Sequence, residues 1–306
     1  MRRLRLRPRQ WQRQPRIIVS ILSHDHGRMF LDFIEIGTSD FDTEIQKNPT
    51  KRGISIEPVR YYLDRLPESP TCKKLNMGIS NYNGVGTVNY LSEEIIKKNS
   101  FPSWVRGCNS INSYHASVSK LCKARQLNIE DIASSYDIPI CTLNRVLTEQ
   151  NVSGIYYLKV DTEGHDTVIL KHFFASLTPL TMPHVILFES NCLTKTDDID
   201  EVISLYKGIG YDMIYRNNND TLLQLNLTRL TKTNFTEELD KYYIMDYPPE
   251  YNPQNLPHEN TLEAAQDFCR KNKYSGVTFQ DGLYQVRSGK YMKYCSTVPC
   301  RSWVLV

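Results

Sequence analysis

The 306-residue sequence lacks several features that define whole classes of protein. No uncharged apolar run approaches the roughly 18–20 residues that a membrane-spanning helix needs, so we expect no transmembrane segment. None of the eight cysteines is spaced as CxxC, which argues against zinc knuckles and thioredoxin-type redox motifs. The cysteines therefore predict reduced, packed thiols rather than a disulfide framework, and we expect a cytoplasmic protein.

Acidic residues are missing from the first sixteen positions, which hold seven arginines. Such a basic arm is typical of a disordered tail, a targeting segment or a polyanion-binding segment. The net charge of the whole chain is +3, so the remainder is mildly acidic. We therefore expect no nucleic-acid groove on the main domain.

What is present is the composition of a globular chain, with 40% hydrophobic and 23% charged residues. Short apolar runs predict strands at residues 30–36, 53–57, 73–80, 84–91, 154–160, 185–189, 212–216 and 222–227. Segments between them predict helices at 39–47, 58–66, 142–150, 165–177 and 198–208. This alternation predicts an α/β fold with a mostly parallel sheet and helices on both faces. Residues 92–135 carry no clear pattern.

A second unit follows a proline-rich stretch at residues 247–257. We expect a basic arm at 1–27, a main domain at 28–245, a linker at 246–260 and a small α+β module at 261–306. The module contains one predicted helix, at 262–272, and several short strands. Because so short a segment makes a marginal core alone, it should dock on the main domain or use Cys269, Cys295 and Cys300 as support.

The first two predicted strands end in a layout typical of nucleotide binding. Glu35 and Gly37 close the first, and Glu57 closes the second, where a carboxylate can accept both ribose hydroxyls. The turn GTSDFD, residues 37–42, lacks the further glycines of a dinucleotide motif, and its two carboxylates would repel a pyrophosphate. A cationic ligand such as S-adenosylmethionine would instead be stabilised by acids such as Glu35, Asp40 and Asp161.

Five runs in the same order resemble the FkbM family of S-adenosylmethionine-dependent methyltransferases: DFIEIGTSDFDT (32–43), GISIEP (53–58), NMGIS (76–80), YLKVDTEGHDTVIL (157–170) and ILFES (186–190). The fourth run is the most specific, because the family typically reads Lys-x-Asp-x-Glu-Gly there. The resemblance implies a class I methyltransferase fold with a seven-stranded sheet, and methyl transfer to oxygen, often of a sugar or polyketide hydroxyl. This chain departs from many relatives at Asp40 and Asp42, where a second glycine is common.

Seven residues are then expected to bind the cofactor: Glu35, Gly37, Ser39 and Asp40 at the methionine half, Glu57 at the ribose, and Asn76 and Met77 at the adenine. Core packing is an equal interpretation for Met77. Ligands of such sheets lie at the carboxyl ends of the strands. The catalytic candidates that follow the later strands are Asp161, Glu163, His165 and Glu189.

An alcohol that attacks a methyl group must lose its proton, so a general base is expected. His165 suits this role because an imidazole titrates near neutral pH, although it could equally decorate the start of a helix. Asp161 could be the base, a cofactor contact or, with Glu163, a ligand of a divalent metal. No full metal-ligand set is visible, so a metal is not favoured.

His115 lies in the unassigned region and either walls the substrate or sits solvated at the surface. The sequence thus predicts an S-adenosylmethionine-dependent O-methyltransferase that acts on a sugar, a glycan or another hydroxyl-bearing acceptor. One alternative is a catalytically inactive methyltransferase fold that serves as a binding module. A nicotinamide-dependent oxidoreductase is the other, and the acidic turn disfavours it.

Overall fold

The computed structural model describes residues 29–230, 234–236, 238–248 and 258–306. The basic arm expected at 1–27 and most of the linker expected at 246–260 lie outside the described residues. No described helix is both long enough and apolar enough to cross a membrane.

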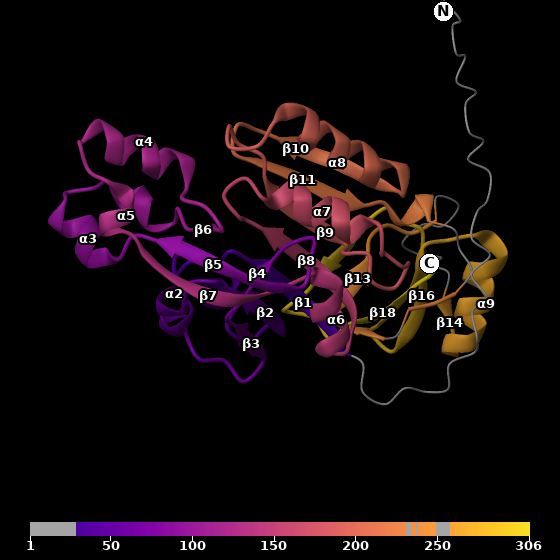
Figure 1. The fold of residues 1–306 in the computed structure, drawn as a ribbon. Coiled ribbons are helices and arrows are strands. Elements are labelled where there is room, and N and C mark those ends of the chain that lie inside the picture. Colours follow the sequence, from indigo (N-terminus) through magenta and orange to yellow (C-terminus); the bar gives the residue numbers. More distant parts are fainter. Residues whose placement is uncertain (1–28, 231–233, 237, 249–257) are drawn as a thin grey trace, which may run out of the picture.

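A seven-stranded sheet forms the centre of the molecule (Figure 1). Its strand order is β10-β11-β9-β8-β1-β2-β3, and only β11 runs antiparallel to its neighbours. The strands are β1 (Met29–Ile36), β2 (Gly53–Ile56), β3 (Cys72–Leu75), β8 (Val152–Val160), β9 (Val185–Glu189), β10 (Tyr211–Arg216) and β11 (Asp220–Leu225). The predicted mostly parallel sheet is therefore confirmed.

The chain leaves the middle of this sheet in two directions. From β1 it runs outward to β2 and β3, and from β8 it runs the other way to β9. Neighbouring strands whose connections leave in opposite directions open a crevice at their carboxyl ends, where ligands of such sheets bind. The crevice is therefore expected between the ends of β1 and β8.

Helices occupy the connections between these strands. They are α1 (Glu44–Lys47), α2 (Arg60–Arg65), α6 (Leu143–Glu149), α7 (Asp166–Phe174) and α8 (Thr196–Gly208). Apolar side chains of β1, β8 and β9 pack with those of α6, α7 and α8 in one core that includes Leu158, Phe173 and Tyr206. Burial of this apolar surface is the main force that holds the sheet and helices together.

Two elements differ from the sequence prediction. The helix expected at 39–47 is only α1, because Thr43 rather than Ser39 or Asp40 caps it through a capping box with Gln46. Ser39 and Asp42 have positive φ and belong to a turn. The strand expected at 73–80 breaks into β3 and the short β4 (Gly78–Ile79), which joins a different sheet.

The region without a clear sequence pattern folds as part of an insertion between β3 and α6. It contains a four-stranded sheet in the order β4-β7-β5-β6, and a small core around Phe101 and Val105. Its further elements are β5 (Gly84–Tyr90), α3 (Glu93–Lys98), η1 (Ser103–Arg106), β6 (Ser110–Ile111), α4 (Ala116–Ala124), α5 (Ile129–Ile132) and β7 (Ser134–Cys141). Figure 1 shows α3, α4 and α5 at one end of the molecule, opposite the C-terminal module.

The C-terminal module docks on the main domain. It holds a five-stranded sheet, β12-β18-β15-β16-β14, and a pair, β13-β17. Its elements are β12 (Leu239–Asp240), β13 (Tyr242–Ile244), β14 (His258–Glu259), α9 (Leu262–Asn272), β15 (Gly276–Gln280), β16 (Leu283–Arg287), β17 (Met292–Tyr294) and β18 (Arg301–Val304). The helix expected at 262–272 is confirmed as α9.

Docking joins the module to the central core rather than to a separate one. Tyr242, Met292 and Val304 are buried in the same cluster as the main sheet, and the Tyr242 hydroxyl donates to Asp32 at 2.6 Å. β12 and β13 precede residue 245, yet they pair with β18 and β17, which follow it. No disulfide joins the cysteines of the described residues, which include Cys269, Cys295 and Cys300, so packing supports the module.

Candidate active site

A cavity of about 350 Å³ lies at the carboxyl ends of β1, β2 and β8, where the strand connections diverge. Its walls come from the turn after β1, the end of β2, the segment before β4 and the loop after β8. The insertion closes one side with Gly107, Asn109 and Asn112. The insertion, which the sequence left unassigned, therefore contributes directly to the cavity.

Gly37, directly after β1, lies close against the backbone of Asp161, directly after β8. Its φ is +80°, and a Cβ built on it would lie 1.8 Å from the backbone oxygen of Asp161. Its N–H donates to Ile56 O at 2.9 Å, and Asp161 N–H donates to Ile36 O at 2.9 Å. Only glycine fits this position, because both the backbone conformation and the space exclude a side chain.

Glu57 lines the cavity just beyond β2, although the residue is only 2% exposed. Its two carboxylate oxygens accept hydrogen bonds from Ser39 N–H at 2.7 Å and Val59 N–H at 2.8 Å. Burial raises the pKa of Glu57 to about 7. The carboxylate is thus fixed in orientation, and its remaining lone pairs can accept donors from a ligand.

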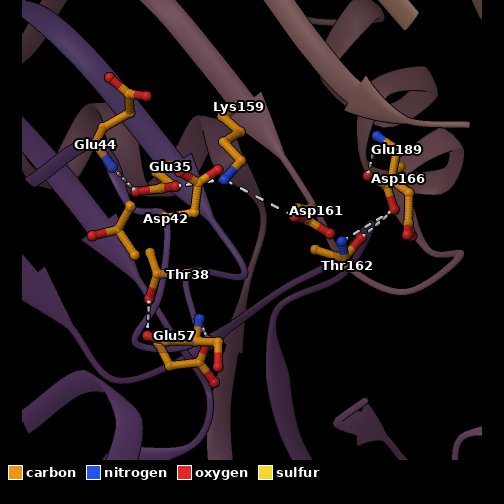
Figure 2. A network of polar contacts seen from close by, with 12 residues as sticks. Glu35, Thr38, Asp42, Glu44, Glu57, Lys159, Asp161, Thr162, Asp166 and Glu189 are labelled. Carbon is orange, nitrogen blue, oxygen red and sulfur yellow. Dashed lines mark hydrogen bonds and ion pairs between the residues drawn. The ribbon is translucent and has the colours of Figure 1, made fainter. Parts of the chain in front are cut away.

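Lys159 and Glu35 form a buried ion pair in the central sheet. The two residues are direct partners of the β1–β8 ladder, and Lys159 Nζ lies 2.8 Å from Glu35 Oε1. The second oxygen, Glu35 Oε2, accepts from Glu44 N–H at 2.9 Å. Figure 2 shows Lys159 between Glu35 and Asp161, which is 4.0 Å away. Lys159 lines the cavity and Glu35 does not.

Asp40 also lies away from the cavity, contrary to its expected contact with the cofactor. Its side chain is 3% exposed and forms ion pairs with Arg106 and with Arg65, the latter at 2.7 Å. Asp42 does line the cavity, and it pairs with Lys47 at 2.9 Å. The acids of this turn are therefore largely neutralised by cations of the same protein.

Asn76 and Met77 follow β3 and have different surroundings. Met77 lines the cavity. The Asn76 amide donates to the backbone oxygens of Glu57 at 2.9 Å and Pro58 at 2.8 Å, and the side chain is not part of the cavity wall. Asn76 thus holds the segment that presents Glu57.

The loop between β8 and α7 carries three of the four catalytic candidates. Asp161, Glu163 and His165 all line the cavity. Glu163 and Gly164 have φ values of +55° and +93°, which turn the chain sharply before the helix. Burial raises the pKa of Asp161 to about 6, and burial lowers the pKa of His165. His165 Nε2 lies 2.9 Å from the hydroxyl oxygen of Ser80.

Glu189, the fourth candidate, ends β9 but does not line the cavity. Its backbone N–H donates to Asp166 Oδ1 at 3.1 Å, and its side chain accepts from the Asn191 amide. Burial raises the pKa of Glu189 to about 9, so its carboxyl group is protonated at neutral pH. Figure 2 shows Asp166 between Thr162 and Glu189, and its carboxylate oxygens accept hydrogen bonds from both.

His115 is buried, so the solvated surface histidine considered from the sequence is wrong. Its Nε2 lies 3.1 Å from Glu163 Oε2, and the ring therefore backs the loop that carries the catalytic candidates. Neither this contact nor the Lys159–Glu35 pair was found from the sequence. Lys159 had a signal, since it stands in the Lys-x-Asp-x-Glu-Gly run, whereas His115 lies in a region without pattern.

Two groups of side chains among the described residues could hold a metal ion. One contains Cys108, His115 and Glu163, and the other contains Asp161, Glu163 and Glu189. In each group the candidate ligand atoms all lie within 4.8 Å of one another. Both groups share Glu163, which lies on the wall of the cavity.

A family model described as the methyltransferase FkbM domain matches residues 25–213, which is more than half of the chain. The match begins before β1 and runs into β10, so it contains every residue of the cavity described above. The C-terminal module lies outside it. Neither a curated protein nor a solved structure matches the chain.

Proposed function

The chain belongs to the FkbM methyltransferase family, and on this basis we propose that it transfers a methyl group from S-adenosylmethionine to a hydroxyl oxygen. The observation that carries the proposal is the cavity at the carboxyl ends of β1, β2 and β8, with Gly37 and Glu57 on its wall. The strand order, with its single antiparallel strand next to the edge, fits a class I methyltransferase fold.

Charge on the cavity wall supports a cationic cofactor. The described part of the chain places four carboxylates on the cavity wall: Asp42, Glu57, Asp161 and Glu163. Among the residues that the structure describes, Lys159 is the only lysine or arginine on the wall, and its ammonium group pairs with Glu35. A sulfonium and an ammonium group are favoured in such surroundings and a pyrophosphate is not. The charge argument thus stands on Asp161 and Glu163, rather than on Glu35 and Asp40.

The wall also suggests how the cofactor lies. Glu57 would accept the ribose hydroxyls, as expected from a carboxylate at the end of the second strand. Gly37 and Ser39 would face the methionine half, and Met77 would contact the adenine. Glu35, Asp40 and Asn76 would act indirectly, because each is engaged with neighbouring residues away from the wall.

The reaction needs positioning and a proton acceptor. The acceptor oxygen attacks the methyl carbon, the carbon–sulfur bond breaks, and its electron pair stays on sulfur as S-adenosylhomocysteine forms. The hydroxyl proton passes to His165, which lines the cavity and is held in place by Ser80. Alignment of the two reacting atoms supplies most of the rate, and a base adds roughly 10²–10⁴-fold.

The acceptor side of the cavity favours a glycan or a similar hydroxyl-bearing molecule. Phe41 and Tyr82 line the cavity, and they are 52% and 39% exposed. The amide groups of Asn109 and Asn112 lie on the same wall. Aromatic faces combined with neutral hydrogen-bonding groups are suited to a polyhydroxylated, uncharged acceptor.

Titration calorimetry with S-adenosylhomocysteine and with NAD tests the cofactor. We expect micromolar or tighter binding of the first and no heat from the second. Transfer of an isotope-labelled methyl group from S-adenosylmethionine to pools of glycans, small metabolites and proteins then tests the reaction. NAD binding without S-adenosylhomocysteine binding would overturn the proposal.

The variant His165→Ala separates an enzyme from an inactive binding module. It should keep S-adenosylhomocysteine binding and lose at least about tenfold in turnover with the acceptor found in the transfer assay. The matched control is His172→Ala, because His172 is partly buried on α7, the helix that follows His165, and does not line the cavity. A wild-type protein that binds cofactor but labels no acceptor pool would instead support a binding module.

A further inference from the structure

Three potential metal ligands from distant parts of the chain converge beside the cavity. Cys108 follows η1 of the insertion, His115 precedes α4, and Glu163 lies in the loop between β8 and α7. Their ligand atoms lie within 4.8 Å of one another, and His115 Nε2 is 3.1 Å from Glu163 Oε2. These segments are not paired in a sheet, and the His115–Glu163 contact links the insertion to the loop.

The two ring nitrogens of His115 have different surroundings, because Nε2 faces Glu163 and Nδ1 does not. The residue is only 7% exposed, and its Nδ1 is buried without a hydrogen-bond partner among the described residues. A buried polar atom without a partner costs about 1–3 kcal/mol, so nearly all such atoms in native proteins are satisfied. An imidazole is also the commonest protein ligand of transition metals.

We propose that Cys108, His115 and Glu163 bind a divalent transition-metal ion of the zinc class. A thiolate, an imidazole and a carboxylate suit Zn²⁺, which binds them at about 2.0–2.3 Å in a tetrahedral arrangement. Ligand atoms within 4.8 Å of one another need only small side-chain movements to reach this geometry. Binding would displace the weak Cys108 thiol contact to Trp104 O, at 3.6 Å.

Mg²⁺ is the less suitable ion for this group. It prefers oxygen ligands in an octahedral arrangement and avoids thiolates. The neighbouring carboxylates Asp161 and Glu189, which form the other candidate group with Glu163, fit that preference better. That group consists of acids alone, whereas the cysteine–histidine group offers a thiolate and an imidazole, which suit zinc.

Three protein ligands leave one position of a tetrahedral ion free, which is the pattern of catalytic rather than structural zinc. Glu163 lies on the cavity wall, and so do Gly107 and Asn109 on either side of Cys108. The free position is therefore accessible to water or to an acceptor oxygen from the cavity. A role for the ion in holding that oxygen and lowering its pKa rests on the proposed methyltransferase function.

Cobalt titration tests the site without any assay of activity. The full chain is reduced, stripped with a chelator and titrated with Co²⁺, whose thiolate charge-transfer absorption reports a cysteine ligand. We expect one equivalent with this absorption, and displacement of Co²⁺ by Zn²⁺ but not by Mg²⁺. Cys108→Ser should abolish the absorption, and His115→Gln should weaken binding at least about tenfold.

Cys192→Ser is the matched control, because Cys192 is an exposed free cysteine outside both groups. It should leave the titration unchanged. Circular dichroism and S-adenosylhomocysteine binding establish that each variant is folded. The proposal is overturned if folded wild type binds no Co²⁺, or if it binds Co²⁺ without thiolate absorption and loses it in Glu189→Gln. Metal binding without S-adenosylhomocysteine binding would instead reject the methyltransferase function and leave the metal site standing.

Discussion

Lys159 Nζ lies 2.8 Å from Glu35 Oε1 in the middle of the central sheet, although the two residues are 124 positions apart in the sequence. The Glu35 side chain is 0% exposed and that of Lys159 is 14% exposed. A carboxylate so deeply buried needs a cation, because an isolated buried charge loses its hydration without compensation. The pair therefore stabilises the two strands that carry the cavity.

Lys159→Met should lower the free energy of unfolding by about 3–5 kcal/mol, because it leaves Glu35 buried without its cation. Adding Glu35→Gln should restore much of that loss, since the remaining buried group is then neutral. Urea unfolding of both single variants and the double variant measures this coupling. Lys171→Met, which breaks a more exposed pair with Asp198, should cost about 1 kcal/mol or less. A double variant as unstable as Lys159→Met would contradict the expected coupling.

Gly37→Ala should destabilise the fold by at least about 4 kcal/mol, because the new Cβ would collide with the backbone of Asp161. Gly282→Ala is a matched control. Gly282 has the same φ of +80°, but a Cβ there meets nothing within 4 Å, so only the backbone strain of about 1–2 kcal/mol remains. Thermal and chemical unfolding compare the two. An equal loss of unfolding free energy in both variants would show that the contact between Gly37 and the backbone of Asp161 does not add to the strain.

Glu57→Gln should weaken S-adenosylhomocysteine binding about 10–100-fold in titration calorimetry. The amide retains one acceptor oxygen but loses the charge and the second acceptor, so the ribose hydroxyls lose a charge-assisted hydrogen bond. Glu68→Gln is the control, because the Glu68 side chain is 88% exposed and lies away from the cavity. Unchanged affinity in the Glu57 variant would remove the proposed ribose contact.

Asp40→Asn should reduce stability while changing the S-adenosylhomocysteine affinity by less than about tenfold. Asp40 pairs with Arg65 and Arg106 and does not line the cavity. The substitution therefore removes two ion pairs of the protein and no contact with the ligand. Unfolding experiments and calorimetry on the same variant separate the two effects. A large loss of S-adenosylhomocysteine affinity at an unchanged free energy of unfolding would support the direct cofactor contact of Asp40 that the sequence predicts.

His184 should make the protein less stable in acid. It is buried beside the rings of Tyr156 and Phe30, and burial lowers its pKa from 6.5 to about 4. The unfolded chain therefore binds a proton that the folded one does not, and the stability associated with neutral His184 is lost as pH falls from about 6.5 to 4. The loss is on the order of 3 kcal/mol.

Chemical unfolding at a series of pH values checks this window. His184→Phe keeps a ring of similar size and cannot titrate, so its stability should fall less steeply than that of the wild type. His172→Phe is the control, since His172 is only partly buried on α7. Parallel pH profiles for wild type and His184→Phe would show that His184 does not contribute.

Much of the fold could be predicted from local sequence patterns. Each strand of the central sheet corresponds to a predicted apolar run, and α9 was predicted with its observed ends. These elements are readable because the period of apolar residues reflects which face is buried, whatever the partner is. Where that period is weak, in residues 92–135, the prediction gave no elements. The structure contains four helical segments there (α3, η1, α4 and α5), the strand β6 and the beginning of β7.

The sequence by itself determined which candidate site residues follow which strand. Gly37 follows β1, Glu57 follows β2, and residues 161–165 follow β8. A parallel sheet brings the ends of these strands together at the cavity. Tertiary structure alone decided which acids face the cavity. Glu35 and Asp40 turned out to be held by Lys159, Arg65 and Arg106, while His115 came from the insertion to meet Glu163. A carboxylate attracts a cationic ligand only weakly when a nearby cation of the protein already neutralises its charge. Those cations lie far away in the sequence, so no local sequence pattern predicts the neutralisation.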